Sequence, residues 1–323
     1  MYTSPSNHTT FIFFIITGIS DIEELQNPIF ILVLFIYVLT LGGNMTILLL
    51  VCFDRHLHTP MYFFLANLSI SDMSSSTITL HKSLVIHITG NKIISYSSCL
   101  AQMYMFASLT GHELFILTAM SYDRYVAICN PLRYHTIMSN KTCVLLAMCC
   151  WVLGFVVVIP PTITVSGFIC YTYNKINHFF CEMASLTMLT CSDTSVLELL
   201  NLTEGLIVST LLPFLLTFIP YIFIISTILR ISSSTGRRKA FYTCSSHLTV
   251  VVLLYVILTC QYIVPTTSTD SKKFFSLFNT VAVPMLNPLI YSLKNKDVMS
   301  ALRRCVRWCR VKYGKTHELR RNI

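Results

Sequence analysis

The stretch AQMYMFASLTGHELFILTAMSYDRYVAICNPLRY (Ala101–Tyr134) decides the fold. It opens with a long run, Ala101–Ile128, that is apolar apart from a few ionisable residues, and it closes in a polar segment. A helix needs about 20 mostly apolar residues to cross the hydrocarbon of a bilayer. The stretch therefore predicts a helix that spans a membrane.

The same pattern recurs on both sides of this stretch. The seven long apolar runs are Pro28–Phe53, Pro60–Val85, Ala101–Ile128, Cys143–Val165, Leu199–Leu229, Ser246–Val264 and Phe274–Leu293. They predict an all-α fold, a bundle of seven transmembrane helices. We expect residues 1–27 to form an extracellular tail, 28–293 the seven-helix domain, and 294–323 a short interfacial helix and cytoplasmic tail.

Composition and charge support a membrane protein. Hydrophobic residues make up 54% and charged residues 11%, whereas an ordinary globular domain has roughly 25% charged residues. With the N-terminus outside, 18 of the 23 lysines and arginines fall on or next to cytoplasmic segments, as the positive-inside bias requires. The exceptions are Lys82, Lys92, Lys175, Lys272 and Lys273. The net charge of +9 thus indicates a multi-pass protein of the plasma membrane and no nucleic-acid partner.

The segments on the outer side carry further signals. The start of the chain lacks a basic region, and Phe11–Ile16 is too short for a signal core, so we expect the first span to act as the signal. Asn7 begins an Asn-His-Thr triplet, an acceptor for glycosylation. Two disulfides are allowed outside, and three pairings are open. The four cysteines are Cys99, Cys170, Cys181 and Cys191.

After the last span, apolar residues recur at helical spacing with basic residues on the other face. These apolar residues are Val298, Leu302, Val306 and Cys309. The pattern predicts a helix that lies in the membrane interface, and the basic tail would face an anionic leaflet. Cys305 and Cys309 are candidates for palmitoylation.

Ionisable residues inside a span are costly, so each one is a candidate functional residue. Asp72 and Glu113 lie midway along the second and third spans. Two carboxylates at similar depth on adjacent helices repel unless one is protonated or a cation bridges them. A sodium ion is one interpretation, and a protonated carboxyl group bonded to neighbours such as Ser69 is the other. A sodium ion is the only cofactor we expect.

The sequence carries no sign of catalysis. His112-Glu113 lacks a second histidine four residues on, so it is not a zinc-protease motif. A phosphate loop, a nucleophile elbow and a metal-spaced Cys/His cluster are also missing from the sequence. A transporter would show more buried ionisable groups and paired broken helices. We therefore expect a protein that transmits a signal, neither an enzyme nor a transporter.

Five longer motifs carry a family resemblance. They are LHTPMYFFLANLSISD (Leu57–Asp72), MSYDRYVAICNPLRY (Met120–Tyr134), HFFCEMASLTMLTCSDT (His178–Thr194), KAFYTCSSHL (Lys239–Leu248) and PMLNPLIYSLKN (Pro284–Asn295). In this order and in these spans, they resemble the olfactory receptors, a rhodopsin-like branch of the G-protein-coupled receptors. The resemblance covers essentially the whole chain.

The resemblance implies which residues act in signalling. In the family, the arginine of Asp-Arg-Tyr is released on activation to contact the G protein, so we carry that role to Arg124. Asn287 is expected to satisfy backbone groups freed by Pro288, and Tyr291 is expected to swing at this hinge. The other residues with an implied role in activation are Asp123, Tyr125, Tyr221, Lys239 and His247.

The resemblance also implies the disulfide pairing and the ligand site. It pairs Cys99 with Cys181 and Cys170 with Cys191. It places the ligand between spans three, five, six and seven. The candidate residues there are Phe106, Ala107, Thr110, Gly111, Gly205, Ser209, Tyr255, Leu258, Thr259, Tyr262, Leu277 and Thr280. This lining is apolar with a few hydroxyl groups, which suits a small volatile molecule with one hydrogen-bonding group.

The implied function is that of an odorant receptor that activates a stimulatory heterotrimeric G protein and raises cyclic AMP. The alternative is a related receptor for an internal metabolite, expressed outside the olfactory epithelium. Three departures from the family pattern concern coupling and the bend of the second span. They are Tyr242, Pro220 and His81-Lys82.

Overall fold

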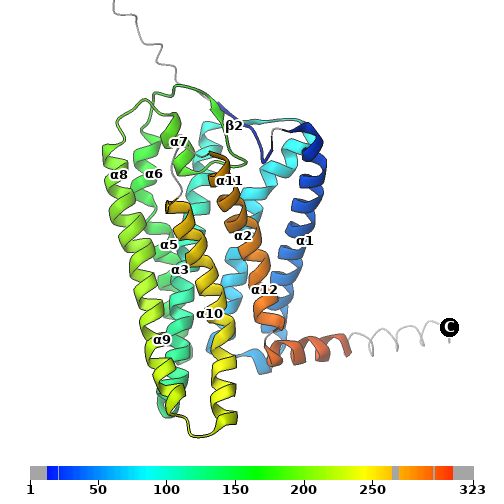
Figure 1. Ribbon diagram of the computed structural model, residues 1–323, viewed down its shortest axis with the longest axis vertical. Helices are drawn as coiled ribbons and strands as arrows, with labels where there is room; N and C mark the ends of the chain where they lie inside the picture. Colours follow the sequence, from blue (N-terminus) through cyan, green and yellow to red (C-terminus); the bar gives the residue numbers. More distant parts are fainter. Residues whose placement is uncertain (1–12, 21, 264–268, 294, 308–323) are drawn as a thin grey trace, which may run out of the picture.

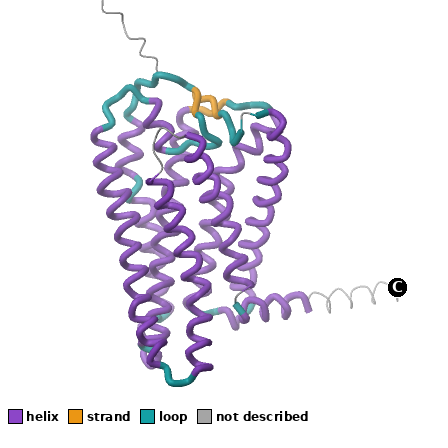
Figure 2. The backbone as a smooth tube through the Cα atoms, in the orientation of Figure 1, coloured by secondary structure: helices purple, strands orange, loops and turns teal. Residues whose placement is uncertain are grey.

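Seven helical rods run side by side in the computed structural model, which describes residues 13–20, 22–263, 269–293 and 295–307 (Figures 1 and 2). The rods are α1 (Glu23–Phe53); α2 (Pro60–Thr89); α3 (Tyr96–Cys129); α5 (Asn140–Val156) with α6 (Ile159–Ser166); α8 (Ser195–Leu200), η3 (Asn201–Leu211) and α9 (Leu212–Arg230); α10 (Ser234–Ile263); and α11 (Thr269–Leu277), η4 (Phe278–Ala282) and α12 (Val283–Leu293). The predicted seven-helix bundle is confirmed.

Short elements connect the rods. They are η1 (Arg55–Leu57), η2 (Pro131–Arg133), α4 (Tyr134–Ile137) and α7 (Met183–Leu189). Several rods extend past the predicted apolar runs: the first begins at Glu23 and the sixth at Ser234. The difference arises because composition marks only the part of a helix that suits lipid, whereas the backbone hydrogen bonds continue into the polar flanks.

The rods differ in polarity, and the difference follows their place in the bundle. Four are long and apolar enough to cross a membrane by length and composition, as judged over the described residues: Glu24–Phe53, Asn140–Ser166, Ser195–Arg230 and Lys273–Tyr291. Helix α1 turns large apolar side chains outward, among them Ile31 at 66% exposed. Helices α2 and α3 instead bury polar residues such as Ser71 and Glu113 in the bundle, where ionisable groups in membranes are normally found.

Glycines allow two close contacts between rods. A Cβ atom on Gly154 of α5 would lie 2.7 Å from the backbone nitrogen of His112 on α3, so no larger residue fits without a shift. A Cβ atom on Gly43 of α1 would lie 3.0 Å from Cγ of Pro288 on α12. Such small residues are typical where transmembrane helices approach closely. They bring α3 against α5, and α1 against α12.

A small sheet, absent from the all-helical prediction, lies at the end of the bundle that carries the two disulfides, which we call the disulfide end (Figure 2). Strand β1 (Phe13–Ile16) pairs antiparallel with β2 (Ile93–Ser95) and parallel with β3 (Lys175–Ile176). These strands are too short for a periodic signal, and they form because three distant segments meet. The segment before α1 is therefore tied to two outer loops.

The other end, which we call the Arg124 end, carries Asp123, Arg124 and the C-terminal helix, residues 296–307. This helix runs across the bundle axis (Figure 1). Val298 and Ala301 are 2% and 1% exposed and face the bundle, whereas Arg303 and Arg307 are exposed. Of the predicted apolar face, Val298 is buried and Leu302 half-buried, and Cys309 lies outside the described residues. Val306 is 44% exposed, so the apolar face shifts toward Ala301.

Candidate ligand and signalling sites

The Asp123–Arg124 pair lies buried at the Arg124 end of α3. Nη2 of Arg124 is 2.9 Å from Oδ2 of Asp123, and the hydroxyl of Tyr134 on α4 donates to Oδ1 at 2.7 Å. Asp123 is 0% and Arg124 9% exposed. A charge that loses its partner in such a place is costly, so the contacts with Arg124 and Tyr134 stabilise the buried carboxylate of Asp123. Tyr134 belongs to a motif quoted above, but sequence reasoning gave it no role.

A second polar contact joins α9 to α10 near the same end. The hydroxyl of Tyr221 and Nδ1 of His247 share a hydrogen bond, and both residues are buried. Tyr125 of α3 packs on Phe223 of α9, with ring centroids 6.0 Å apart. The predicted activation residues of α3, α9 and α10 thus lie in one region. The side chain of Lys239 lies outside the described residues.

Asp72, Glu113 and Asn287 meet in the middle of the bundle. The Nδ2 group of Asn287 donates to both carboxylate oxygens of Asp72, at 3.2 and 3.0 Å, and to Oε1 of Glu113 at 3.4 Å. The predicted meeting of the two carboxylates is therefore present. Ser69 does not bond either one: its buried hydroxyl has no hydrogen-bond partner among the described residues.

The hinge at Pro288 differs from the prediction. Pro288 has no N–H, so the carbonyl of Pro284, four residues earlier, lacks its helical donor. Nδ2 of Asn44 on α1 donates to this carbonyl at 3.0 Å. The residue that satisfies the freed group is thus Asn44 from another rod. Asn287 was the wrong choice because its amide points to the carboxylates.

Tyr291 completes the hinge region. It is the largest fully buried side chain, at 0% exposed, and its hydroxyl has no hydrogen-bond partner among the described residues. It packs in the same apolar cluster as Met120 of α3 and Val250 of α10. A buried hydroxyl without a partner is costly, so a swing of Tyr291 to a new partner would relieve that cost.

The predicted ligand residues form two groups, each of which packs within the bundle. Phe106 of α3 and Leu277 of α11 pack against the cluster that contains Phe179, Phe180 and Val281. Tyr255 of α10 packs edge-on against Phe214 of the fifth rod, at 5.2 Å between ring centroids. Thr280, three residues after Leu277, and Leu258, three residues after Tyr255, are also buried. Sequence reasoning missed Phe179, Phe180 and Phe214.

The other predicted ligand residues are less uniform. A Cβ atom added to Gly111 would lie 3.5 Å from Cα of Gly154. Gly111 therefore belongs to the α3–α5 contact and not to the ligand region. Ala107, Thr110 and Ser209 are half-buried, and Gly205 has open space around it. Thr259 is exposed and donates to the carbonyl of Tyr255. The side chain of Tyr262 lies outside the described residues.

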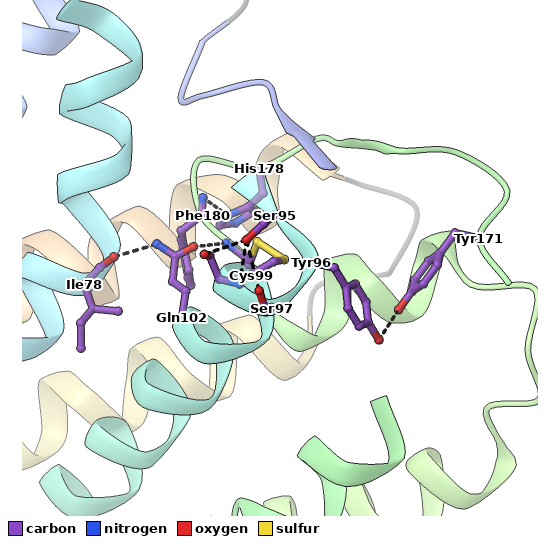
Figure 3. The surroundings of a disulfide bond; sticks show 11 residues. Ile78, Ser95, Tyr96, Ser97, Cys99, Gln102, Tyr171, His178 and Phe180 are labelled. Atoms are coloured by element: carbon purple, nitrogen blue, oxygen red, sulfur yellow. Dashed lines mark hydrogen bonds between the residues drawn. A yellow bond between two sulfur atoms is a disulfide. The ribbon is translucent and has the colours of Figure 1, made fainter. Parts of the chain in front are cut away.

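The disulfide end closes over the aromatic cluster. Cys99 pairs with Cys181 and Cys170 with Cys191, as the family resemblance implied. Gln102 reinforces the first pair: it accepts from the backbone N–H of Cys181 at 2.9 Å and donates to the carbonyl of Ile78 at 2.7 Å (Figure 3). The loop that follows α6 is therefore fixed to α2 and α3.

His178 and Glu182 join this loop to α11. Nε2 of His178 lies 3.5 Å from Oε1 of Glu182, whose Oε2 accepts from the hydroxyl of Ser276 at 3.3 Å. Burial lowers the pKa of His178 below its ordinary value, although the charge of Glu182 opposes this effect. Burial thus favours the neutral form of His178.

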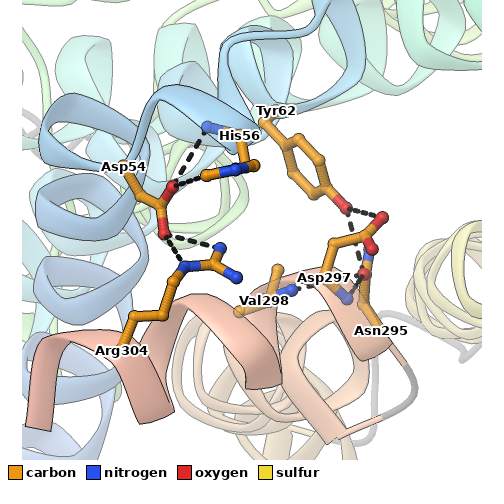
Figure 4. A network of polar contacts seen from close by, with 7 residues as sticks. All are labelled: Asp54, His56, Tyr62, Asn295, Asp297, Val298 and Arg304. Carbon is orange, nitrogen blue, oxygen red and sulfur yellow. Dashed lines mark hydrogen bonds and ion pairs between the residues drawn. The ribbon is translucent and has the colours of Figure 1, made fainter. Parts of the chain in front are cut away.

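The C-terminal helix is held at the Arg124 end by a polar network (Figure 4). Arg304 donates to Oδ2 of Asp54 through Nε at 2.8 Å and through Nη2 at 2.6 Å. The hydroxyl of Tyr62 donates to Asn295 at 3.0 Å and to Asp297 at 3.2 Å. Burial alone would raise the pKa of Asp54, but hydrogen bonds from Arg304 and His56 outweigh it and lower the pKa to about 2.

The class of protein follows from the fold. The chain is similar to squid rhodopsin in its crystal structure, with a TM-score of 0.70 over 89% of this chain and 87% of that one. The two sequences are 17% identical, so this likeness concerns the fold alone. Together with the apolar rods, it defines a multi-pass membrane protein with the fold of the rhodopsin-like receptors.

Sequence comparison then gives the family. The family described as Olfactory receptor matches residues 33–307. Olfactory receptor 6C74 from Homo sapiens is 43% identical over 93% of this chain and 97% of its own length, and Olfactory receptor 8K3 from Homo sapiens is 46% identical over 92% and 96%. Olfactory receptor 5AR1 from Mus musculus is 43% identical over 93% and 97%. The chain belongs to the olfactory receptor family, and it is a receptor and not an enzyme.

Proposed function

We propose that this receptor binds a small, mostly apolar volatile molecule, activates a stimulatory heterotrimeric G protein and so raises cyclic AMP. The observation that carries the proposal is the buried Asp123–Arg124 pair, which lies at the same end as the Tyr221–His247 contact between α9 and α10. Release of Arg124 would supply a cation to the G protein, at the end where α9 and α10 would move apart on activation. A ligand acts through its different affinities for the closed and open states.

The ligand is proposed to lie between Phe106, Tyr255, Leu277 and Thr280. Aromatic and aliphatic side chains predominate there, and the hydroxyl groups of Tyr255 and Thr280 are the polar groups. A lining of this kind favours a neutral molecule with one hydrogen-bonding group. Phe180 packs on Phe106 at 4.8 Å between ring centroids and on Phe179 at 4.9 Å, and these two rings would cover the site.

The proposed orientation puts the disulfide end outside the cell, in the plasma membrane. Disulfides persist in an oxidising compartment, and both pairs lie at this end. The opposite end carries Arg133, Arg230, Arg303 and Arg307, as the positive-inside bias requires for a cytoplasmic face. Asn7, the proposed glycosylation site, precedes the described residues.

A sodium ion is proposed as a modulator between Asp72 and Glu113. The residues fit such an ion because they offer hard oxygen donors in a buried place. Besides the two carboxylates, Oδ1 of Asn287 and Oγ of Ser69 are buried and have no hydrogen-bond partner among the described residues. The ion would neutralise charge there. Agonist potency should then depend on sodium concentration, and Glu113→Gln should remove that dependence.

The test of function is a cyclic AMP assay in cells that express the receptor with trafficking helpers. A panel of volatile odorants should include at least one that raises cyclic AMP in a concentration-dependent way, and Arg124→Ala should remove the rise at unchanged surface expression. A receptor that reaches the surface and answers only to water-soluble metabolites would overturn the proposed ligand class. A response that survives Arg124→Ala would overturn the proposed route to the G protein.

A further inference from the structure

A cavity of about 370 Å³ lies apart from the ligand region, between the outer ends of α1 and α2. The segment that follows β1, residues 17–20, contributes to its wall. The residues predicted to bind the odorant do not line it. Its volume falls within the range of roughly 300–1,000 Å³ that holds small ligands.

The inner wall of the cavity is apolar. Ile29 and Val33 of α1 face Leu84 and Ile86 of α2 across it. Val33 and Ile86 are 3% and 8% exposed, so they offer hydrocarbon surface that water barely reaches. Phe30 stacks on His87 at 4.1 Å between ring centroids and 11° between planes, which adds a flat face. Such a wall suits a hydrocarbon chain.

The rim of the cavity is polar and carries one formal positive charge. Gln26 and Asn27 of α1, Ser83 of α2 and Lys92 of the first outer loop contribute to it. Lys92 is the one residue in the lining with a formal charge at pH 7 when histidine is neutral. Amide, hydroxyl and ammonium donors together suit an anionic head group with two acceptor oxygens.

The backbone around Lys92 is fixed. Its carbonyl accepts from the N–H of Ile16 in β1 at 2.9 Å. Nζ of Lys82 donates to the carbonyls on either side, Asn91 at 3.2 Å and Ile93 at 2.7 Å. The positive charge is thus carried by a preorganised loop, which reduces the cost of ordering it on binding.

We propose that this cavity binds a fatty acid, with its carboxylate at Lys92 and its chain against Val33 and Leu84. The cavity lies at the ends of α1 and α2, where hydrocarbon gives way to water, so an amphiphile can place its chain inward and its head at the rim. The site goes beyond the proposed odorant site and does not depend on it. A fatty acid there would affect signalling only through its different affinities for the two states.

The test is photolabelling of the purified full-length receptor in lipid nanodiscs. The probe is lauric acid that carries a diazirine near the chain end and an alkyne handle, and labelled peptides are identified by mass spectrometry. Labels should fall in residues 29–33 and 83–87. Unlabelled laurate should compete at least tenfold better than dodecanol, which has the same chain without the charge. Equal competition by both would overturn the assignment of an acid.

Two variants locate the site. Lys92→Gln should weaken labelling about tenfold, and Ser83→Phe, which fills the cavity, should abolish it. Lys175→Gln is the matched control, because Lys175 is an exposed lysine at the same end outside the cavity. Thermal unfolding of each variant checks its fold, and Ser83→Phe decides the question if Lys92→Gln does not fold. Labels in α3 or α10, or labelling unchanged in both variants, would overturn the proposal. Neither result bears on the odorant assay.

Discussion

The two ends of the bundle are held by different forces. The Arg124 end relies on pairs of polar side chains, in which Asp123 meets Arg124 and Tyr134, and Tyr221 meets His247. The disulfide end relies on covalent bonds, backbone hydrogen bonds and the aromatic cluster around Phe179 and Phe180. A polar pair can separate at the cost of its hydrogen bonds, whereas opening a disulfide needs a reductant. Under the proposed function, this difference assigns switching to the Arg124 end and a fixed frame to the disulfide end.

The largest expected effect tests the switching end. Arg124→Ala should reduce the cyclic AMP response at saturating odorant to background, because the released cation is then missing. Surface staining of intact cells should match that of the unsubstituted receptor. Arg133→Ala is the control, since Arg133 is exposed at the same end. Equal losses in both variants would mean that general positive charge matters, and not the buried pair.

The next largest effect tests the disulfide between Cys99 and Cys181. Cys99→Ser or Cys181→Ser should cut delivery to the surface severalfold, because loss of a native disulfide typically costs about 2–5 kcal/mol. Flow cytometry of cells stained for an N-terminal tag measures delivery. Cys149→Ser, a change at a free and exposed cysteine, should have no effect. Full delivery of both disulfide variants would show that the frame holds without the covalent bond.

A third prediction concerns the contact of Asn44 with α12 beside Pro288. Asn44→Ala should lower the free energy of unfolding by about 1–3 kcal/mol, because the carbonyl of Pro284 loses its donor in a buried place. Thermal unfolding of purified receptor measures it. In a Pro288→Ala background, the new N–H of residue 288 can serve that carbonyl, so the cost of Asn44→Ala should shrink there. If Asn44→Ala lowers the free energy of unfolding equally in both backgrounds, Asn44 does not act by bonding the carbonyl of Pro284.

A fourth prediction concerns the ligand region. Phe180→Leu and Tyr255→Phe should each shift agonist potency about tenfold, which corresponds to about 1.4 kcal/mol of binding free energy. Phe180 contacts Phe106, and Tyr255 contacts Phe214. Concentration–response curves of cyclic AMP measure the shift. Tyr122→Phe, at an exposed position, is the control. Unchanged potency of several agonists in both variants would show that the ligand binds elsewhere.

The smallest expected effect concerns the anchor of the C-terminal helix. The pKa of Asp54 is lowered to about 2, so its contribution is present above the unfolded value of about 3.9 and is lost as the pH falls toward 2. Between pH 5 and 8 the anchor should not change. Asp54→Asn should weaken it at pH 7 by less than about 1 kcal/mol, as for a partly exposed pair.

Hydrogen exchange of residues 296–307 measures this anchor. Arg304→Ala should raise the exchange as much as Asp54→Asn does, because both remove the same pair. Arg303→Ala should not, since Arg303 is exposed and takes no part in the pair. Loss of protection between pH 5 and 8 in the unsubstituted receptor would point to another titrating group.

The sequence alone was sufficient for the seven-helix bundle and for the neighbouring positions of Asp123 and Arg124. Apolar runs located the seven rods, and adjacent residues such as Asp123 and Arg124 pair through short-range geometry. The partner of the Pro284 carbonyl could not be found this way, because the choice between Asn287 and Asn44 depends on how α1 packs against α12. Gly111 was misassigned for a similar reason: its direction is set by the contact with Gly154. The strands of the disulfide end are equally non-local.

The contact between Asn44 and Pro284 spans 240 residues. A ribosome makes α1 first and α12 last of the seven rods, so the amide of Asn44 is made long before the carbonyl that it serves at Pro284. The hinge is therefore a feature of the finished chain. A receptor truncated before its last rod would leave the amide of Asn44 bonded to the carbonyl of Thr40 on its own helix, at 3.1 Å, and without the contact that joins the first rod to the last.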